Sequence, residues 1–289
     1  SINVSRFDAN KHLAQAIVGD AKISLKDLSN ALGDWRAGEE WNKKSQNELA
    51  AWNAHIDKES APSNQEIPSY VQVIGAIYKN SDPSDIAVTA AGGLVGEVVQ
   101  VWRPRELNTH ETEWGFSCMS YEISGALGIK MANPNKEVIS FVGDGSYLLN
   151  NTDIYSSVIT KNKLIIIVCD NGGFAVINRL QLFKGGNEYN NLFKSSNTPG
   201  LVDVDFAKHA ESMGAKSEHV NSISDLEEAF KRAKKSDVTY VISIKTHAYQ
   251  WLEGSAFWDS PTLEIPTTDE NKEALKLYKE GKSKQRQGV

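Results

Sequence analysis

The chain is poor in cysteine and has no long apolar run. Its 289 residues include only two cysteines, Cys118 and Cys169, so no disulfide scaffold is expected and a reducing, cytoplasmic location is the simplest interpretation. No stretch approaches the roughly 20 apolar residues that a membrane span requires. The first residues show no signal-peptide pattern. The sequence therefore predicts a cytoplasmic protein without a membrane partner.

Basic residues are also in the minority. The formal net charge is −6, from 31 Lys and Arg against 37 Asp and Glu, and the one basic cluster lies at 282–286. We therefore expect no nucleic-acid partner. No Gly-x-Gly-x-x-Gly follows a predicted strand, which argues against a dinucleotide-binding protein. The 40% hydrophobic and 24% charged residues are typical of a globular chain with one large or two ordinary domains.

Apolar runs alternate with helical patterns along most of the chain. This alternation predicts an α/β fold with a doubly wound, mostly parallel sheet. A Pro- and Ser-containing segment at 61–68 reads as a linker. It divides the chain into an N-terminal part (1–60), a main domain (61–250) and a tail (251–289). We expect strands at 86–90, 138–142, 164–169 and 240–244, and helices at 24–32, 39–56, 71–78, 120–132, 152–160 and 270–279.

Two polar motifs follow neighbouring predicted strands. Asp144 lies in a Gly-Asp-Gly-Ser motif directly after the strand at 138–142, and Asn171 directly follows the strand region at 164–169. The helix predicted between them makes a strand-helix-strand unit, which returns the second strand parallel to the first. Asp144 and Asn171 are therefore expected at one edge of the sheet, where α/β folds bind ligands.

The side chains and backbone at this edge suit a metal ion and a phosphate group. Asp144, Asn171 and a backbone carbonyl made accessible by the Gly172-Gly173 turn offer three oxygen ligands of the kind that Mg²⁺ prefers. Gly145 and Ser146 offer backbone N–H groups at a helix start, which suit phosphate. The alternative is a pair of solvated turns, because both motifs are common turn sequences.

The two motifs at this spacing resemble the thiamine diphosphate signature of acetolactate-synthase-like enzymes. Residues 2–9 and 113–123 resemble one branch of that family, the trihydroxycyclohexane-1,2-dione hydrolases of myo-inositol catabolism, and the likeness runs from residue 2 to about residue 285. The resemblance implies thiamine diphosphate and Mg²⁺ as cofactors, and hydrolytic C–C cleavage of a cyclic 1,2-diketone to 5-deoxy-glucuronate. A carboligase or 2-keto-acid decarboxylase of the same family is the alternative.

The resemblance also implies roles for individual residues. Met119 would wedge between the two rings of the cofactor, and Ser117 and Cys118 flank it; the alternative for Met119 is ordinary core packing. Cys118 is interpreted as a packing residue. Gly92 and Gly93 would form a loop around the diphosphate, or else an ordinary turn. The implied metal ligands are Asp144, Asn171 and Gly173, and the implied cofactor-binding residues are Gly92, Gly93, Leu94, Ser117, Met119, Gly143, Gly145 and Ser146.

The resemblance leaves the catalytic residue unknown. In this family a glutamate from a separate pyrimidine-binding domain activates the cofactor, and no segment before residue 60 is long enough for that domain. Residues 1–60 then correspond to the end of a middle domain. We expect either a fragment or a split subunit, completed by a homo-oligomer or by a partner chain that carries the pyrimidine-binding domain. A non-catalytic module is the remaining alternative. Glu97 and Glu122 do not match the position of the activating glutamate.

Overall fold

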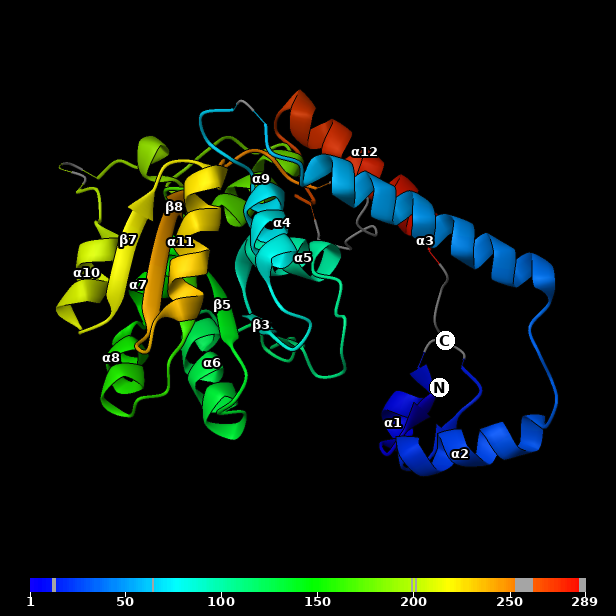
Figure 1. Ribbon diagram of the computed structural model, residues 1–289. Helices are drawn as coiled ribbons and strands as arrows, with labels where there is room; N and C mark the ends of the chain where they lie inside the picture. Colours follow the sequence, from blue (N-terminus) through cyan, green and yellow to red (C-terminus); the bar gives the residue numbers. More distant parts are fainter. Residues whose placement is uncertain (12–13, 64, 199, 201, 253–261, 286–289) are drawn as a thin grey trace.

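A six-stranded parallel sheet forms the centre of the molecule (Figure 1). The computed structural model describes residues 1–11, 14–63, 65–198, 200, 202–252 and 262–285. The strand order is β4-β3-β5-β6-β8-β7, and every pairing is parallel. The predicted doubly wound α/β fold is therefore confirmed. The strands are β3 (Ile86–Thr89), β4 (His110–Thr112), β5 (Val138–Gly143), β6 (Ile165–Asp170), β7 (Lys216–Val220) and β8 (Tyr240–Lys245).

Helices cover both faces of the sheet, which is why its central strands are apolar on both sides. In β5, Ile139 and Phe141 belong to one core, whereas Val138 and Val142 belong to the other. The first core contains side chains of α4 (Tyr70–Asn80), α5 (Gly92–Val101) and α11 (Ile223–Lys235). The second contains side chains of α6 (Tyr121–Ala132), α7 (Asp144–Leu149), α8 (Thr152–Ile159) and α10 (Phe206–Ser212).

The unit from β5 to β6 has the predicted strand-helix-strand arrangement. After β5 the chain passes through α7 and α8 and returns in β6, which pairs with β5 in parallel. Gly143 lies opposite Cys169 in this pairing. The two polar motifs therefore begin at the same level of the sheet, at its carboxyl edge.

Four elements of the main domain differ from the sequence-based expectations. Gly92 and Gly93 belong to the first turn of α5, so the prediction of a loop there was wrong. The apolar side chains of Leu94, Val98 and Val101 recur at helical spacing and are buried, which explains why the helix starts so early. The short edge strands β4 and β7 and the helix α9 (Ala175–Phe183) were not expected at all.

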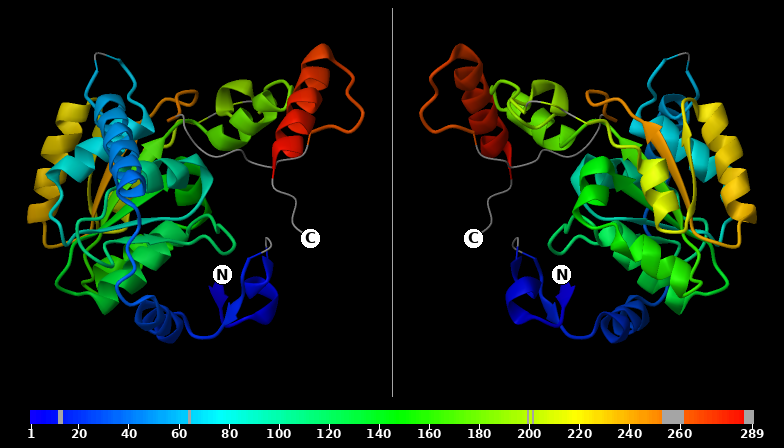
Figure 2. Two further views of the ribbon diagram at one scale, coloured as in Figure 1. Left: turned by 90° about the vertical axis from the view of Figure 1, so that its right-hand side faces the viewer. Right: turned by 90° about the vertical axis from the view of Figure 1, so that its left-hand side faces the viewer.

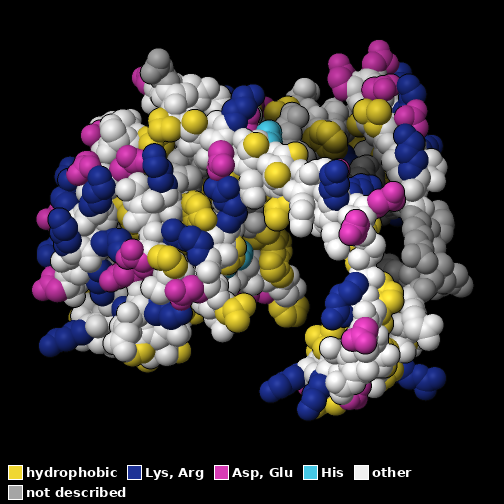
Figure 3. Space-filling view, turned by 45° about the vertical axis from the view of Figure 1, so that its right-hand side comes forward, with side chains coloured by type: hydrophobic (Ala, Val, Ile, Leu, Met, Phe, Trp, Pro, Cys, Tyr) yellow, Lys and Arg dark blue, Asp and Glu magenta, His cyan; other side chains and the backbone are white. Residues whose placement is uncertain are grey.

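The N-terminal segment lies away from the sheet except at the end of its last helix (Figures 1 and 2). Its elements are β1 (Ile2–Asn3), α1 (Arg6–Ala9), β2 (Ile17–Val18), α2 (Ala21–Leu32) and the long α3 (Glu39–Glu59), whose Ile56 is buried in the core beside α4. None of the residues of α2 is buried. Val4, Phe7 and Trp35 are 75%, 77% and 62% exposed, and hydrophobic side chains are visible on this segment in Figure 3.

The C-terminal helix α12 (Asp269–Lys284) packs beside the end of α9 (Figure 2). Asn271 Nδ2 donates a hydrogen bond to the carbonyl of Gly185 at 2.6 Å, and Lys184 Nζ lies 5.6 Å from the centre of the Tyr278 ring. A 3-10 turn, η2 (Phe193–Ser195), follows α9. Within the described ranges, no helix combines the length and the apolar character needed to cross a membrane.

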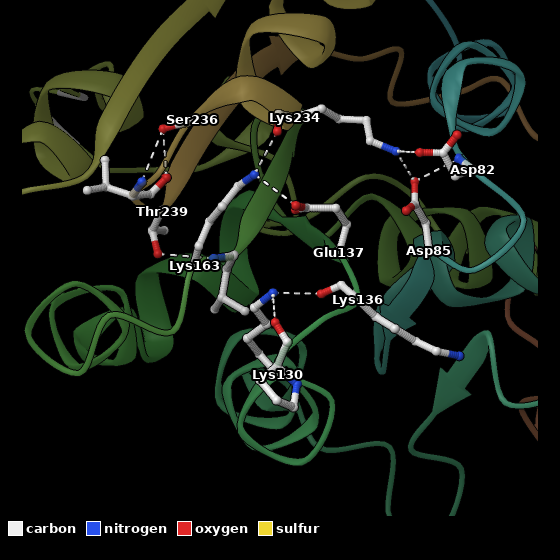
Figure 4. Close-up of polar contacts among 12 residues, drawn as sticks. Asp82, Asp85, Lys130, Lys136, Glu137, Lys163, Lys234, Ser236 and Thr239 are labelled. Carbon is white, nitrogen blue, oxygen red and sulfur yellow. Dashed lines mark hydrogen bonds and ion pairs between the residues drawn. The ribbon is translucent and has the colours of Figure 1, made fainter.

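Charged side chains are paired at the amino edge of the sheet (Figure 4). Lys163 Nζ lies 3.0 Å from Glu137 Oε1 and also donates to the Lys234 carbonyl at 3.1 Å. Lys234 Nζ lies 2.7 Å from Asp85 Oδ2. Lys130 Nζ donates to two carbonyls of the 134–136 turn, at 3.0 and 2.6 Å. These three lysines are therefore all bound by groups of the chain itself.

Candidate functional site

A cavity of about 330 Å³ opens at the carboxyl ends of β3, β5 and β6. All eleven residues that the sequence nominated line it, so the structure brings the whole predicted set together, while their individual roles stay predictions. Seven further lining residues were not anticipated: Tyr70, Ala91, Phe174, Ala175, Val176, Ile177 and Leu180. The nominated residues are Gly92, Gly93, Leu94, Ser117, Met119, Gly143, Asp144, Gly145, Ser146, Asn171 and Gly173.

Asp144 is the buried carboxylate of this cavity. It begins α7 and is 3% exposed, and its Oδ2 accepts a hydrogen bond from the Gly173 N–H at 2.7 Å. Burial and the nearby Asp170 carboxylate raise the pKa of Asp144. A cation bound at this carboxylate would reverse that effect, because its positive charge favours the ionised form.

The loop after β6 is held in one shape by glycines and by Asp170. Gly172 and Gly173 have φ angles of 77° and 141°, a region that favours glycine. A Cβ on Gly173 would stand 2.5 Å from the Asn191 carbonyl oxygen. Asp170 Oδ1 accepts from the Gly172 N–H at 3.0 Å, and the Gly172 carbonyl accepts from the Phe193 N–H at 2.9 Å. The loop therefore presents Asn171 and Gly173 to the cavity in a fixed conformation.

Asn171 supplies the test of whether this site fits a metal ion. Its Nδ2 donates to the Tyr70 hydroxyl, whereas its Oδ1 is buried and has no hydrogen-bond partner. An unpartnered buried amide oxygen is costly unless it binds something. Together with the buried Asp144 carboxylate, this oxygen makes the hard donor set that suits Mg²⁺. Across the described residues, no three or more His, Cys, Asp and Glu side chains form a metal-binding cluster.

Two helix N-termini face the same cavity, through the first residues of α5 and α7. Neither helix has a hydrogen bond from the side chain of its N-cap residue, Ala91 or Gly143. First-turn N–H groups and the helix dipole favour an anion at such positions. Gly93 also needs to be glycine, because a Cβ there would stand 2.3 Å from the Trp251 ring. The site thus combines oxygen donors for a cation with N–H donors for a phosphate group.

Met119 and Ser117 line a further side of the cavity. Met119 Cε lies 3.5 Å from where a Cβ of Gly145 would stand, and Ser117 Oγ donates to the Ala90 carbonyl at 3.3 Å. The Glu113 carboxylate accepts from the N–H groups of Phe116 and Cys118, both at 2.8 Å, and these backbone hydrogen bonds lower the pKa of Glu113. The interpretation of Cys118 as a packing residue was wrong, because its side chain is exposed on this turn.

Two buried glutamates lie behind the cavity. Glu97 Oε1 accepts from the Leu252 N–H at 3.0 Å, and burial raises the pKa of Glu97 to about 7. Glu122 Oε1 accepts from the Ala91 N–H at 3.2 Å, and burial raises the pKa of Glu122. Within the part of the chain that the structure describes, no glutamate lines the cavity. Both glutamates therefore hold the backbone around the site.

The chain belongs to the family of thiamine pyrophosphate enzymes. Residues 90–244, more than half of the chain, match the model of the C-terminal TPP-binding domain of these enzymes. The 3D-(3,5/4)-trihydroxycyclohexane-1,2-dione hydrolase of Geobacillus thermodenitrificans is 33% identical over 302 residues, covering 93% of this chain and 46% of the relative. The hydrolase of the same name from Clostridium tetani is 34% identical over 288 residues, covering 89% and 45%. The chain thus spans about half the length of the curated relatives it matches.

Solved structures share the fold. The thiamine diphosphate-dependent 4-hydroxybenzoylformate decarboxylase of Rhodococcus jostii superposes with a TM-score of 0.61 at 19% identity, covering 81% of this chain and 41% of that one. Benzoylformate decarboxylase of Polynucleobacter necessarius gives 0.52 at 22% identity, covering 62% and 33%. The cofactor of the family is thiamine diphosphate, usually with Mg²⁺, and the donor set described above fits both.

Proposed function

We propose that this chain is the diphosphate- and metal-binding half of a thiamine-diphosphate-dependent hydrolase. Its substrate would be trihydroxycyclohexane-1,2-dione, cleaved at a C–C bond to 5-deoxy-glucuronate. The observation that carries the proposal is one cavity that holds both the buried Asp144 carboxylate and the unpartnered Oδ1 of Asn171 and that two helix N-termini face. The hydrolase name carried by relatives that match 93% and 89% of the chain supports the substrate.

Each part of the cavity has a role in this proposal. Asp144, Asn171 Oδ1 and the Gly173 carbonyl would hold Mg²⁺, whose charge would offset that of the diphosphate. The N–H groups at the starts of α5 and α7, from Gly92 to Leu94 and from Gly143 to Ser146, hold the diphosphate oxygens. Met119 would stand between the two rings of the cofactor, with Ser117 beside it. When bound, thiamine diphosphate supplies a nucleophilic carbon and an electron sink for breaking a bond beside a carbonyl.

The proposal also covers the parts of the chain outside the cavity. Residues 1–60 would be the end of a middle domain with its linker, residues 61–250 the diphosphate-binding domain, and residues 251–289 a tail. The match of the family model to residues 90–244 supports the middle range, because it lies within residues 61–250. The activating glutamate would come from a pyrimidine-binding domain, carried by another copy in a homo-oligomer or by a partner chain.

An activity assay with two substrates tests the proposal. The chain, with Mg²⁺ and excess thiamine diphosphate, is given the cyclic diketone or a 2-keto acid, alone and together with a polypeptide covering the N-terminal half of the Geobacillus relative. We expect little turnover alone and hydrolysis of the diketone in the mixture, abolished by Asp144→Ala and retained by Asp153→Ala at the start of α8. Release of CO₂ from the 2-keto acid would favour a decarboxylase or carboligase instead. No turnover in any mixture would favour a non-catalytic module.

A further inference from the structure

The amide of Asn171 has two chemically different ends, and only one of them binds a cation. Its Oδ1 can ligate a metal ion, whereas its Nδ2 carries two hydrogens and cannot. A half-turn of the side-chain amide would exchange the two ends. The Asp144 carboxylate lines the same cavity, and a carboxylate accepts hydrogen bonds from an amide nitrogen but not from an amide oxygen. The metal site therefore needs a group that selects the oxygen end.

Tyr70 contacts the amide from outside the loop. Asn171 Nδ2 donates to the Tyr70 hydroxyl, across 101 residues of sequence, and Asn171 Oδ1 is left without a partner. Both residues line the cavity. The loop's other contacts, made by Asp170 and Phe193, engage the backbone of Gly172 and leave the amide of Asn171 to Tyr70.

The side chain of Tyr70 is held in place by the start of its helix and by the packing of its ring. Tyr70 is the first residue of α4, directly after the capping box in which Ser69 and Gln72 satisfy each other's backbone N–H groups. Its side chain is buried, with 3% exposure, and its ring packs edge-on against Trp251 at 6.0 Å between centroids. A rigid hydroxyl of this kind can orient a neighbouring amide.

The hydrogen bond itself shows which end of the amide Tyr70 holds. Asn171 Nδ2 donates, and the Tyr70 hydroxyl accepts through a lone pair. Because Tyr70 is buried, water does not compete for this hydroxyl. The Oδ1 end of the amide is then directed away from Tyr70 and has no protein partner.

We propose that Tyr70 is a positioning residue that holds the Nδ2 end of the Asn171 amide and thereby presents Oδ1 to the metal ion. This inference rests on the metal site of the proposed function. It adds a residue from α4, a helix that contributes no ligand, to the machinery of that site. It also gives the metal site a dependence on the segment that precedes the sheet.

The test separates metal affinity from cofactor affinity. Tyr70→Phe removes the hydroxyl and keeps the ring against Trp251. Tyr78→Phe is the matched control, because it lies on the same helix and its ring packs edge-on against Trp102 at 5.4 Å. We expect Tyr70→Phe to raise the Mg²⁺ concentration that half-saturates thiamine diphosphate binding about five-fold. Cofactor affinity at saturating Mg²⁺ should stay within about two-fold, and Tyr78→Phe should change neither.

A double-mutant cycle tests the orientation itself. Asn171→Asp puts an oxygen at both ends of the side chain, so no end has to be selected. In that background Tyr70→Phe should change the Mg²⁺ requirement by less than about two-fold. Titration calorimetry measures all four proteins at a temperature where each is folded.

The outcomes distinguish this inference from the proposed function. A wild-type chain that does not bind thiamine diphosphate with Mg²⁺ would remove both. Wild-type binding with an unchanged Mg²⁺ requirement in Tyr70→Phe would overturn the role of Tyr70 alone. A loss of cofactor affinity that persists at saturating Mg²⁺ would mean a structural role, and an undiminished effect beside Asn171→Asp would refute the selection of an amide end.

Discussion

The two edges of the same sheet differ in how their buried charged groups are paired. At the amino edge, Lys163 and Lys234 are both paired with carboxylates and Lys130 with carbonyls, although the second oxygen of Glu137 is buried without a partner (Figure 4). At the carboxyl edge, Asn171 Oδ1 and Glu97 Oε2 are buried without partners. Pairing stabilises a fold, whereas an unpaired buried group costs free energy. The amino edge therefore serves stability, and the carboxyl edge gives up stability for binding.

The carboxyl edge also concentrates negative charge. Asp170 is held by Lys245, whose Nζ lies 2.6 Å from Asp170 Oδ2. Among the described residues, Asp144 has hydrogen bonds but no ion pair. A cation at Asp144 would supply the missing charge, so binding Mg²⁺ would remove a cost that the folded chain bears alone. The unpaired Asp144 carboxylate thus marks the position where a bound cation would stabilise the folded chain.

The largest effects should come from breaking each edge separately. Asp144→Ala should weaken Mg²⁺-dependent thiamine diphosphate binding at least about 100-fold. It should not lower the free energy of unfolding, because the side chain that it removes is a buried carboxylate with a raised pKa.

At the amino edge, Lys163→Met should lower the free energy of unfolding by about 2–4 kcal/mol, because it leaves Glu137 without its cation. Its cofactor affinity should stay that of the wild type. Calorimetry and urea unfolding measure both; a Lys163→Met protein that folds but binds weakly would contradict the division.

The middle of the fold was predictable because its signals are local. The strands β5 and β6 are continuous apolar runs, each followed by a polar motif with glycine, and the helix between them has its own periodicity. The edge strand β7 reads Lys-Ser-Glu-His-Val, and only Val220 in it is buried. A strand that is paired on one side and largely accessible leaves no apolar run in the sequence. Edge strands were missed for that reason.

The site was predictable to the extent that its residues follow strands. Asp144 and Asn171 could be brought together from the crossover alone, since parallel strands share one carboxyl edge. Tyr70 could not, because nothing near it in sequence marks a cavity and it reaches Asn171 only through the packing of α4. The free side chain of Cys118 was also missed, since it depends on the turn that Glu113 folds.

A pH titration of stability sharpens the comparison at Glu97. The unfolded chain releases this proton near the ordinary pKa of 4.5, whereas burial lets the folded chain keep it up to about 7, against the weaker opposing effects of the Leu252 N–H and Arg179. The folded wild type should therefore lose about 3 kcal/mol relative to the unfolded chain as pH rises from about 4.5 to 7.

Glu97→Gln should remove that loss, because the amide keeps an oxygen for the Leu252 N–H and releases no proton. Its free energy of unfolding should match the wild type near pH 4.5 and exceed it by about 3 kcal/mol at pH 8. Glu211→Gln, at an exposed position, is the control and should follow the wild type at every pH. A constant difference between Glu97→Gln and wild type across this range would mean that Glu97 does not titrate there.

The smallest effects come from backbone strain, which occurs at both edges. Ser120 beside Met119 has a φ of 83°, and Lys161 after α8 has a φ of 56°, both in the region that favours glycine. Ser120→Gly and Lys161→Gly should each raise the free energy of unfolding by about 0.5–1 kcal/mol, since relieved strain exceeds the added entropy of the unfolded chain.

Cofactor binding should distinguish the two variants. Of the two residues, Ser120 alone supports a wall of the cavity, because Met119 precedes it and lines the site. Ser120→Gly should therefore also weaken cofactor binding about two- to three-fold by loosening Met119, a change of about 0.5 kcal/mol. Lys161→Gly should leave binding unchanged. Equal affinities in the two variants, measured by calorimetry beside urea unfolding, would show that the strain at Ser120 serves the turn alone and not the cavity.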